Sequence, residues 1–342
     1  MDLKALYVEI WDRIQQVDFS QLWKGFYPLK FALYNEDHCF FNGAYVEKTD
    51  DFLANTSIRY QGEYIAIWNV NAPVDPDILA SKIIHEMFHA FQNIHGEQRF
   101  PNEMDALLRY HYSVENLSIK AEENRLLFSL MHRFDRENFQ KLLSLRNYRR
   151  IHFSYEYLYE AAVEQIEGTA TYVELSVLKQ LSLEKYQLRI DQILNKLNDP
   201  NNLFPIRILS YEIGALLCLV LKENQWMDFE FFSEELFAVK LLHTVPGSET
   251  VRADEKISQM IHTYFSETAS IIEQAQNCGV CIAEGDIDLL GINIYDARWL
   301  KPYIYSRYFV RYAIKGNIRT GNGNFVIELD DTGKAIRIFQ LS

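Results

Sequence analysis

The sequence predicts an α+β fold that is mainly helical, with a small N-terminal sheet and a C-terminal β-meander. Its 342 residues include only 14 Gly and 8 Pro, which favours long helices over a turn-rich all-β fold. Apolar residues make up 48% of the chain and aromatic residues 14%, so it has the side chains for a substantial core. After Cys281 the composition changes, and short extended runs separated by turn residues replace the helical pattern.

The N-terminal region, up to about residue 75, is predicted to hold one helix and a small sheet. The helix covers Met1 to Gln16, where acidic residues interrupt every apolar stretch. Turn residues at 35–37 and 61–63 then separate three extended runs, which are Leu29–Tyr34, Cys39–Val46 and Tyr64–Val70. These runs are the expected strands of the sheet.

A helix is predicted from Asp75 to Gly96. Asp75 suits the N-cap, Pro76 suits the first helical position, and Gly96 suits the C-terminal end. Apolar residues follow at helical spacing at Ile78, Ile83, Met87 and Phe91.

The helical pattern continues to about residue 285. The expected helical segments are Asn102–Leu145, Tyr155–Leu181, Ile206–Lys222 and Thr250–Gln276, with a loop at 198–202. We therefore expect residues 76–285 to form a helical lobe that makes one large region with the N-terminal sheet lobe. Residues 286–342 are expected to form a small β-module, with three strands from Tyr308 onward. Asn322-Gly323 and residues 331–333 are its predicted hairpin turns.

The charge and the apolar runs disfavour several classes of protein. Lys and Arg number 34 against 47 Asp and Glu, which leaves a net charge of −13 and no basic run for nucleic-acid binding. The longest notable apolar run, Gly214–Leu221, is too short for a membrane span. The first residues lack the pattern of a signal peptide, and four Cys do not make a disulfide framework. We therefore expect a cytoplasmic protein with no nucleic-acid or membrane partner.

The segment His85-Glu86-Met87-Phe88-His89 lies in the middle of the capped helix. Histidines at i and i+4 project from one face of a helix and suit a single tetrahedral zinc ion. Zinc lowers the pKa of a bound water from about 15.7 toward about 7, and Glu86 is placed to take its proton as general base. The flanking residues are almost all apolar, so this helix is expected to be buried, where a His-Glu-His cluster needs a compensating ion.

Two residues compete for the place of third ligand. His95 completes a spacing similar to that of the metzincins, but Gln92 stands where that family has the glycine that turns the chain back. If the helix continues to Gly96, His95 lies about 9 Å beyond His89 and points away. The other candidate is Glu167, from a predicted helix that carries carboxylates on one stripe at 164, 167 and 174. Such a stripe beside an apolar face needs a neutralising cation.

Gly168 is a second unusual feature of that helix. Glycine costs about 1 kcal/mol inside a helix and often marks the close approach of another backbone. A neighbouring metal-binding helix would explain both the carboxylates and the glycine. The alternative is an acidic, solvent-facing stripe with an incidental glycine.

The His-Glu-x-x-His segment and the later Glu167-Gly-Thr-Ala-Thr-Tyr-Val-Glu174 together resemble the gluzincin metallopeptidases, which include the M1 aminopeptidases. The resemblance implies zinc as cofactor, Glu167 as third ligand, a peptide or protein substrate and a zincin-like architecture. It also implies that Tyr64–Val70 is the edge strand that runs beside the substrate.

The resemblance covers only about residues 64–93 and 161–174. The separation of His89 from Glu167 is longer than in the M1 enzymes, and their Gly-x-Met-Glu-Asn segment is absent. Exopeptidase activity is therefore not implied.

Tyrosine, second-helix and cysteine positions offer further candidates. Tyr211 resembles the tyrosine that donates a hydrogen bond to the oxyanion in several gluzincins, although most tyrosines in a chain with 21 of them pack in the core. Thr171 and Glu164 are candidates for orienting a zinc histidine, or are helix surface residues. Cys278 and Cys281 have redox or zinc spacing, but no second pair completes a site.

The resulting hypothesis is a zinc-dependent metallopeptidase or amide hydrolase. His85, His89 and Glu167 are its expected ligands, and Glu86 and Tyr211 its catalytic residues. Two alternatives remain open from the sequence: a catalytically silent zincin-like protein that binds a partner or serves a structural role, and a metzincin-like enzyme with His95 as ligand.

Overall fold

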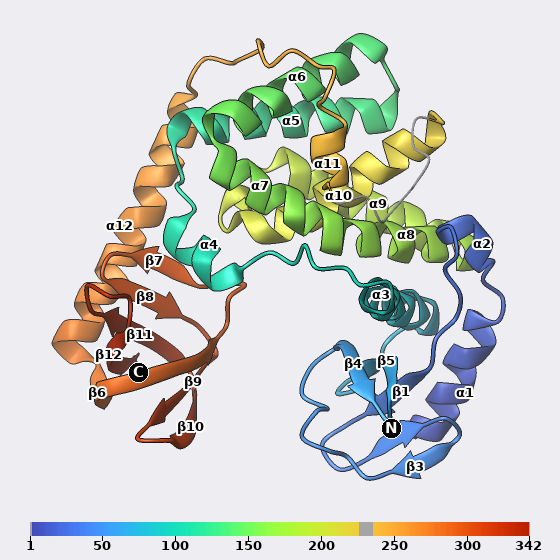
Figure 1. Ribbon diagram of the computed structural model, residues 1–342, viewed down its shortest axis with the longest axis horizontal. Coiled ribbons are helices and arrows are strands. Elements are labelled where there is room, and N and C mark those ends of the chain that lie inside the picture. Colours follow the sequence, from blue (N-terminus) through green and yellow to red (C-terminus); the bar gives the residue numbers. More distant parts are fainter. Residues whose placement is uncertain (1, 226–234, 342) are drawn as a thin grey trace.

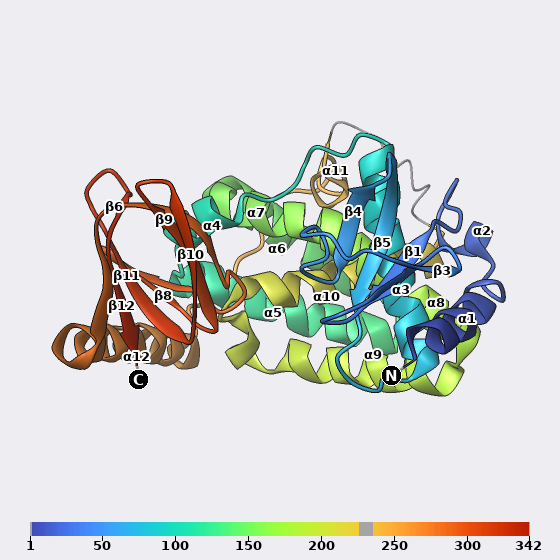
Figure 2. The same ribbon diagram turned by 90° about the horizontal axis from the view of Figure 1, so that it is seen from below.

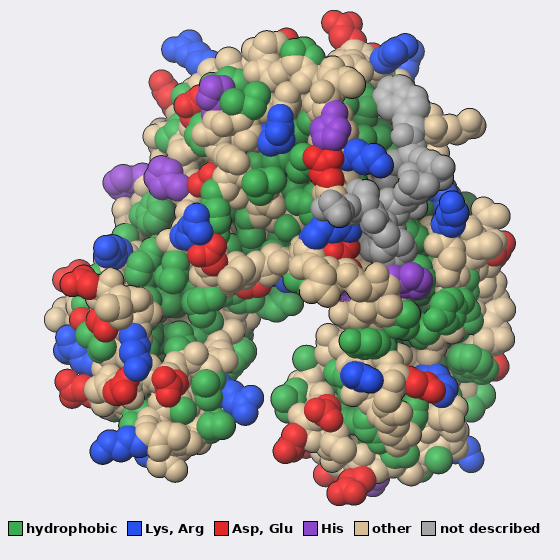
Figure 3. All heavy atoms as spheres, viewed as in Figure 1, with side chains coloured by type: hydrophobic (Ala, Val, Ile, Leu, Met, Phe, Trp, Pro, Cys, Tyr) green, Lys and Arg blue, Asp and Glu red, His purple; other side chains and the backbone are tan. Residues whose placement is uncertain are grey.

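Two separate sheets stand on opposite sides of a notch, and a helical lobe joins them (Figures 1 and 3). The computed structural model of the chain describes residues 2–225 and 235–341. Its helices and two sheets form the predicted α+β fold. Among the described helices, none combines the length and the apolar character needed to cross a bilayer.

The N-terminal lobe begins with α1 (Leu3–Ile14), whose N-cap Asp2 accepts hydrogen bonds from the backbone amides of Lys4 and Ala5. Its five-stranded sheet has the order β3-β2-β1-β5-β4. The strands are β1 (Phe31–Tyr34), β2 (Cys39–Phe41), β3 (Ala44–Val46), β4 (Thr56–Tyr60) and β5 (Glu63–Asn69). The run predicted at Cys39–Val46 is therefore a hairpin, because Asn42 and Gly43 both adopt positive φ and turn the chain between β2 and β3.

The prediction for the edge strand was wrong. Strand β5, expected at the edge, lies between β1, to which it is parallel, and β4, to which it is antiparallel. The edge strand on this side of the sheet is β4. Its side chains are half-buried or exposed, so its sequence lacks the apolar pattern that would predict a strand. In Figures 1 and 2, β4 lies on the side of the sheet that faces the C-terminal module.

The helix predicted at Asp75 is α3 (Pro76–Ile94). The Asp75 carboxylate accepts hydrogen bonds from the amides of Asp77 and Ile78, and Gly96 adopts the positive φ typical of a helix end. One side of α3 packs on β5 and another on α8. This helix is therefore held between the sheet and the helical lobe.

The helical lobe follows the predicted segments with three differences. The segment expected at 102–145 consists of α4 (Glu103–Arg109), α5 (Val114–His132) and α6 (Arg136–His152). The helix α9 (Leu183–Asn198) was missed, whereas α10 (Ile206–Glu223) and α12 (Glu255–Cys278) match their predictions closely. The segment predicted at 155–181 consists of α7 (Ser154–Val163), a π-helical turn (Glu164–Gly168) and α8 (Thr169–Leu181). Shorter helices are α2 (Phe19–Leu22) and α11 (Phe237–Lys240).

Gly168 ends the π-helical turn and lies against α10. A Cβ atom on Gly168 would lie 2.7 Å from the Cα atom of Gly214. The predicted close approach of a second backbone is therefore present, but the neighbour is α10 and not the helix that carries the histidines.

The C-terminal sheet has seven strands in the order β10-β9-β6-β12-β11-β8-β7. They are β6 (Val280–Ile292), β7 (Arg298–Leu300), β8 (Tyr303–Ser306), β9 (Phe309–Ile314), β10 (Asn317–Asn322), β11 (Asn324–Leu329) and β12 (Ala335–Leu341). The sheet begins at Val280, so the boundary expected at 285 falls inside β6, and four strands follow Tyr308 where three were expected. The predicted β-meander is wrong, because β6 pairs with β9 and β8 pairs with β11, so strands distant in the chain are neighbours in the sheet. Helix α12 packs on this sheet through Ile272 and Ala275.

One of the two predicted hairpin turns of the module was wrong. Residues 331–333 do connect the antiparallel strands β11 and β12. Asn322-Gly323 connects β10 and β11, which are not neighbours in the sheet. The second tight hairpin lies at Lys315-Gly316, where both residues have positive φ, as a two-residue turn between twisted strands requires.

Candidate metal centre

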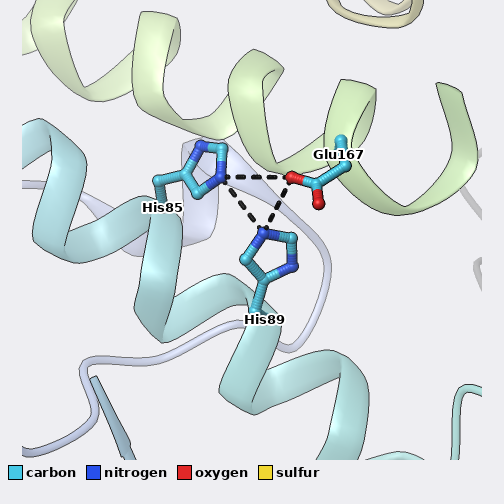
Figure 4. Close-up of side chains that lie close together, drawn as sticks. All are labelled: His85, His89 and Glu167. Atoms are coloured by element: carbon cyan, nitrogen blue, oxygen red, sulfur yellow. Dashed lines mark hydrogen bonds and ion pairs between the residues drawn. The ribbon is translucent and has the colours of Figure 1, made fainter. Parts of the chain in front are cut away.

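Three side chains from two helices converge on one point (Figure 4). His85 and His89 project from the same face of α3, one helical turn apart, and Glu167 projects toward them from the π-helical turn. The Nε2 atoms of His85 and His89 lie 3.1 Å apart. The Oε2 atom of Glu167 lies 3.8 Å from Nε2 of His85 and 3.3 Å from Nε2 of His89.

These separations match the donor atoms of a tetrahedral zinc site. Two atoms that each bind one tetrahedral zinc at about 2.0–2.1 Å lie roughly 3.3 Å apart. Two imidazole nitrogens and one carboxylate oxygen are also the donor set of catalytic zinc sites with an open fourth position. The three side chains are 12%, 14% and 17% exposed, so the cluster is largely buried yet reachable.

The outward nitrogen atom of each imidazole has its own partner. The Nδ1 atom of His85 lies 3.2 Å from the Glu174 carboxylate. The Nδ1 atom of His89 lies 2.8 Å from Oε1 of Gln92, and the Gln92 amide nitrogen in turn donates to the carbonyl oxygen of Ile166. The Gln92 contact has hydrogen-bond geometry, whereas the Glu174 carboxylate acts on Nδ1 of His85 through its charge at ion-pair distance, without hydrogen-bond geometry. Both partners favour a proton on Nδ1 and leave Nε2 to face the metal position, as a metal-binding histidine requires.

Neither of the two residues that sequence reasoning had considered for orienting the histidines makes these contacts. The Glu164 carboxylate lies 2.6 Å from a guanidinium nitrogen of Arg146, in a buried ion cluster, and Thr171 is buried in the wall of the cavity beside His85. The π-helical turn explains why Glu164 and Glu167 do not share one face of the helix. The wider turn changes the helical phase between positions 164 and 167. Glu174 was visible in the sequence as a carboxylate two turns beyond Glu167.

The charges of the cluster favour a cation. Burial lowers the pKa of His85, but Glu167 and Glu174 outweigh that effect and raise it to about 10. Burial also lowers the pKa of His89, but Glu167 outweighs burial and raises it. Burial raises the pKa of Glu174, yet His85 and Lys82 lower it to about 2. The two carboxylates thus create a negative field at the imidazoles, and a divalent ion would satisfy it.

Arg207 connects the cluster to a further carboxylate, that of Glu103. Its guanidinium lies 3.4 Å from Oε1 of Glu167 and also pairs with Glu103 of α4. The side chain is only 10% exposed and lies over the rings of Tyr211 and Tyr295, the latter from the C-terminal module. Arg207 therefore holds the oxygen of Glu167 that faces away from His85 and His89. No local pattern in the sequence indicated this role.

A cavity of about 220 Å³ opens beside His85. His85, Glu86 and Tyr211 all line it, together with Trp68 at the end of β5. Glu86 is half-buried, and among the described residues it has no hydrogen-bond or ion-pair partner. Its carboxylate is therefore free to accept a proton from a molecule in the cavity.

The Tyr211 hydroxyl is buried and has no hydrogen-bond partner within the described part of the chain. The neighbouring Tyr295 affects its pKa but does not reach hydrogen-bond geometry. Burial, with Glu167 nearby, raises the pKa of Tyr211 well above its usual range, so the phenol keeps its proton. A buried, unsatisfied donor of this kind calls for a ligand group as acceptor.

His95 lies outside this cluster. It is the C-cap of α3, and its Nδ1 atom lies 2.9 Å from the carbonyl oxygen of Phe91, whose ring it contacts. Among the described residues, the group placed to hold a metal is His85, His89 and Glu167. Cys278 and Cys281 are exposed free thiols at the junction of α12 and β6.

The chain matches no protein-family model, no curated protein and no solved structure.

Proposed function

We propose that this protein is a zinc-dependent hydrolase of peptide or amide bonds, with the zinc site of a gluzincin metallopeptidase. The observation that carries the proposal is the convergence of the His85, His89 and Glu167 side chains, with His85 and Glu86 both lining the adjacent cavity. His85, His89 and Glu167 would hold the zinc ion. When bound, zinc supplies Lewis-acid chemistry, because it lowers the pKa of water and polarises a carbonyl group.

Glu86 acts as the general base in this proposal. It follows His85 directly on α3, so its carboxylate projects beside the imidazole pair and lines the same cavity. No other described side chain pairs with the Glu86 carboxylate. The carboxylate therefore takes a proton from the attacking water and then delivers that proton to the leaving amine. Such proton transfer contributes about 10²- to 10⁴-fold to the rate.

Tyr211 stabilises the oxyanion in this proposal. Its hydroxyl keeps its proton, is buried and lacks a partner among the described residues, and it lines the cavity opposite α3. A preorganised donor needs no reorganisation when negative charge develops on the carbonyl oxygen. Arg207 supports this arrangement because its guanidinium lies against both the Tyr211 ring and the Glu167 carboxylate.

The edge strand β4 is a place for an extended peptide. Among the described strands of the sheet, β4 pairs with β5 on one side and has its other side unpaired. It also lies next to α3, where the Asn93 side-chain amide lies 3.5 Å from the Ser57 hydroxyl. The unpaired side of β4 faces the notch in Figures 1 and 3. An extended peptide that paired with this edge would gain backbone hydrogen bonds beside the histidines. This supports a peptide as substrate, with β4 in the role first expected of β5.

The proposal is tested by metal analysis and a cleavage assay on the full chain. We expect close to one zinc per chain by elemental analysis, and peptide fragments by mass spectrometry after incubation with a mixed peptide library. Glu86→Gln should keep the zinc and reduce cleavage at least 100-fold. Negligible zinc in the wild type, or undiminished cleavage by Glu86→Gln, would refute the proposal.

A pair of variants separates the two possible third ligands. Glu167→Ala should lose most of the zinc, whereas His95→Ala should keep it, because the His95 ring nitrogen is held at the end of α3. The opposite result would favour the metzincin-like alternative.

A further inference from the structure

We infer that the space between the helical lobe and the C-terminal module binds an aromatic or other large apolar side chain of the peptide substrate. The inference rests on the proposed function, since it names the substrate side chain selected beside the same centre. It also assigns a role to the C-terminal module, which has none in the chemistry described above.

The binding space is a cavity of about 290 Å³ between α4, α10, α12 and the module. Aromatic rings dominate its walls: Tyr110, Tyr112 and Tyr264 from the helical lobe, and Trp299 from β7. The Tyr112 and Tyr264 rings lie 5.5 Å apart and form one continuous surface. Small-molecule sites have about 300–1,000 Å³, so this cavity suits a single large side chain better than a whole ligand or a folded partner.

Arg109, His111 and Lys301 also line the cavity, but the polar groups of two of its tyrosines are engaged by neighbouring carboxylates. The Tyr110 hydroxyl donates to Glu160 at 2.6 Å, and the Tyr159 hydroxyl donates to Glu103 at 2.8 Å. Glu103 is also paired with Arg207. With these groups satisfied, the walls present mainly ring faces and aliphatic atoms, to which an apolar group binds well and a charged group does not.

Arg207 separates this cavity from the metal centre. One guanidinium nitrogen pairs with Glu103 in the wall of the cavity, and another lies 3.4 Å from Glu167. The cavity thus begins one side chain away from a carboxylate of the candidate centre. Adjacent residues of an extended peptide are about 3.3–3.6 Å apart along the chain, so a residue close to the scissile bond can reach it.

The C-terminal module supplies one side of the cavity. Ala297, Trp299 and Leu300 line it, and Tyr295 from the same segment lies against Arg207. In Figure 3, hydrophobic side chains gather where this module meets the helices, beside the notch, and Figure 1 shows β4 on the other side of that notch. A peptide paired with β4 can therefore extend across the notch toward this pocket.

The test uses the full-length chain carrying Glu86→Gln, so that binding is measured without cleavage. The probes are fluorescein-labelled, six-residue Ala-rich peptides with one Phe placed at each position in turn, and an all-Ala peptide. At one position, Phe should tighten binding by on the order of tenfold. Adding Trp299→Ala or Ala297→Leu should abolish that preference, whereas Trp11→Ala, a change at an exposed tryptophan of α1, should preserve it.

A photoreactive benzoylphenylalanine at the preferred position provides a measurement that needs no pocket variant. It should crosslink to residues of the cavity such as Tyr112, Tyr264 or Trp299, identified by mass spectrometry. Equal binding of all peptides, crosslinks confined to other regions, or a Phe preference that persists in both folded variants would overturn the inference. If the preference and the crosslinks hold but the wild type contains no zinc and cleaves nothing, the pocket stands and the proposed hydrolase does not.

Discussion

The carboxylate of Glu174 lies 3.2 Å from Nδ1 of His85, while Nε2 of the same ring faces His89 and Glu167. Glu174 thus orients one candidate ligand and makes it more basic, as a carboxylate behind a metal-bound imidazole does. The carboxylate is itself held by Lys82 at 3.4 Å. Its placement follows from α8, which packs along α3.

Glu174→Gln is expected to weaken zinc binding about 10- to 100-fold, because the imidazole loses its charged partner but keeps its surroundings. Competition with a chromophoric chelator measures the change. Glu184→Gln, at an exposed position in α9, serves as the matched control and should bind zinc like the wild type. Equal affinities of the two variants would show that Glu174 does not support the site.

Tyr211→Phe removes the unpaired hydroxyl and leaves the ring against Arg207. If this hydroxyl stabilises the oxyanion, kcat should fall about 10²- to 10³-fold while KM and zinc content change little. Tyr308→Phe, on an exposed tyrosine, should retain activity. A kcat within a few-fold of wild type would remove Tyr211 from the mechanism.

Gly168→Ala should destabilise the protein by about 1–3 kcal/mol. The new Cβ would lie 2.7 Å from the Cα of Gly214, and backbone atoms of two packed helices cannot move apart freely. Chemical denaturation measures the loss. Gly291→Ala is the control, because its nearest neighbours would lie 3.8 Å away. Since Glu167 precedes Gly168, we also expect weaker zinc binding; unchanged stability would contradict the close helix contact.

Acid should destabilise the helical lobe through Glu160. Burial raises the pKa of this carboxyl, but Arg149 and Lys120 outweigh burial and lower it from 4.5 to about 2. A lowered folded-state pKa means that the contribution to stability is complete above about pH 4.5 and is lost as the pH falls toward 2. Lys120 Nζ lies 2.7 Å from Glu160, and both side chains are fully buried.

Glu160→Gln should therefore lower the free energy of unfolding at pH 7 by about 3–5 kcal/mol, because it leaves buried cations without their partner. Denaturant titrations at pH 7, 4 and 3 should show a smaller loss of stability in this variant than in the wild type as the pH falls below 4.5. Glu137→Gln, at an exposed position, should follow the wild type. Parallel curves for all three proteins would contradict the assigned role of Glu160.

The features set by residues close together in the chain were predictable. Asp75, Pro76 and Gly96 determine where α3 begins and ends, and the spacing of His85 and His89 places both imidazoles on one face of it. The segment around Glu167 indicated a second helix with an unusual carboxylate and an unusual glycine. In the C-terminal module, the turn at 331–333 was recognised, because its signal is local.

Tertiary packing decided the rest. The resemblance implied that β5 is an edge strand, but β4 pairs with it, and Asn322-Gly323 resembles a hairpin turn although its two strands have other neighbours. Strand pairing depends on residues distant in the chain, so periodicity does not reveal it.

The sequence by itself thus determined the helix that presents His85 and His89, because capping and side-chain spacing act within a few residues. Only the tertiary structure decided what surrounds them: Glu167 turned inward by the π-helical turn, Glu174 and Gln92 behind the imidazoles, and Arg207 beside them. The physical reason is that hydrogen bonds and ion pairs between distant segments form only after those segments have packed together.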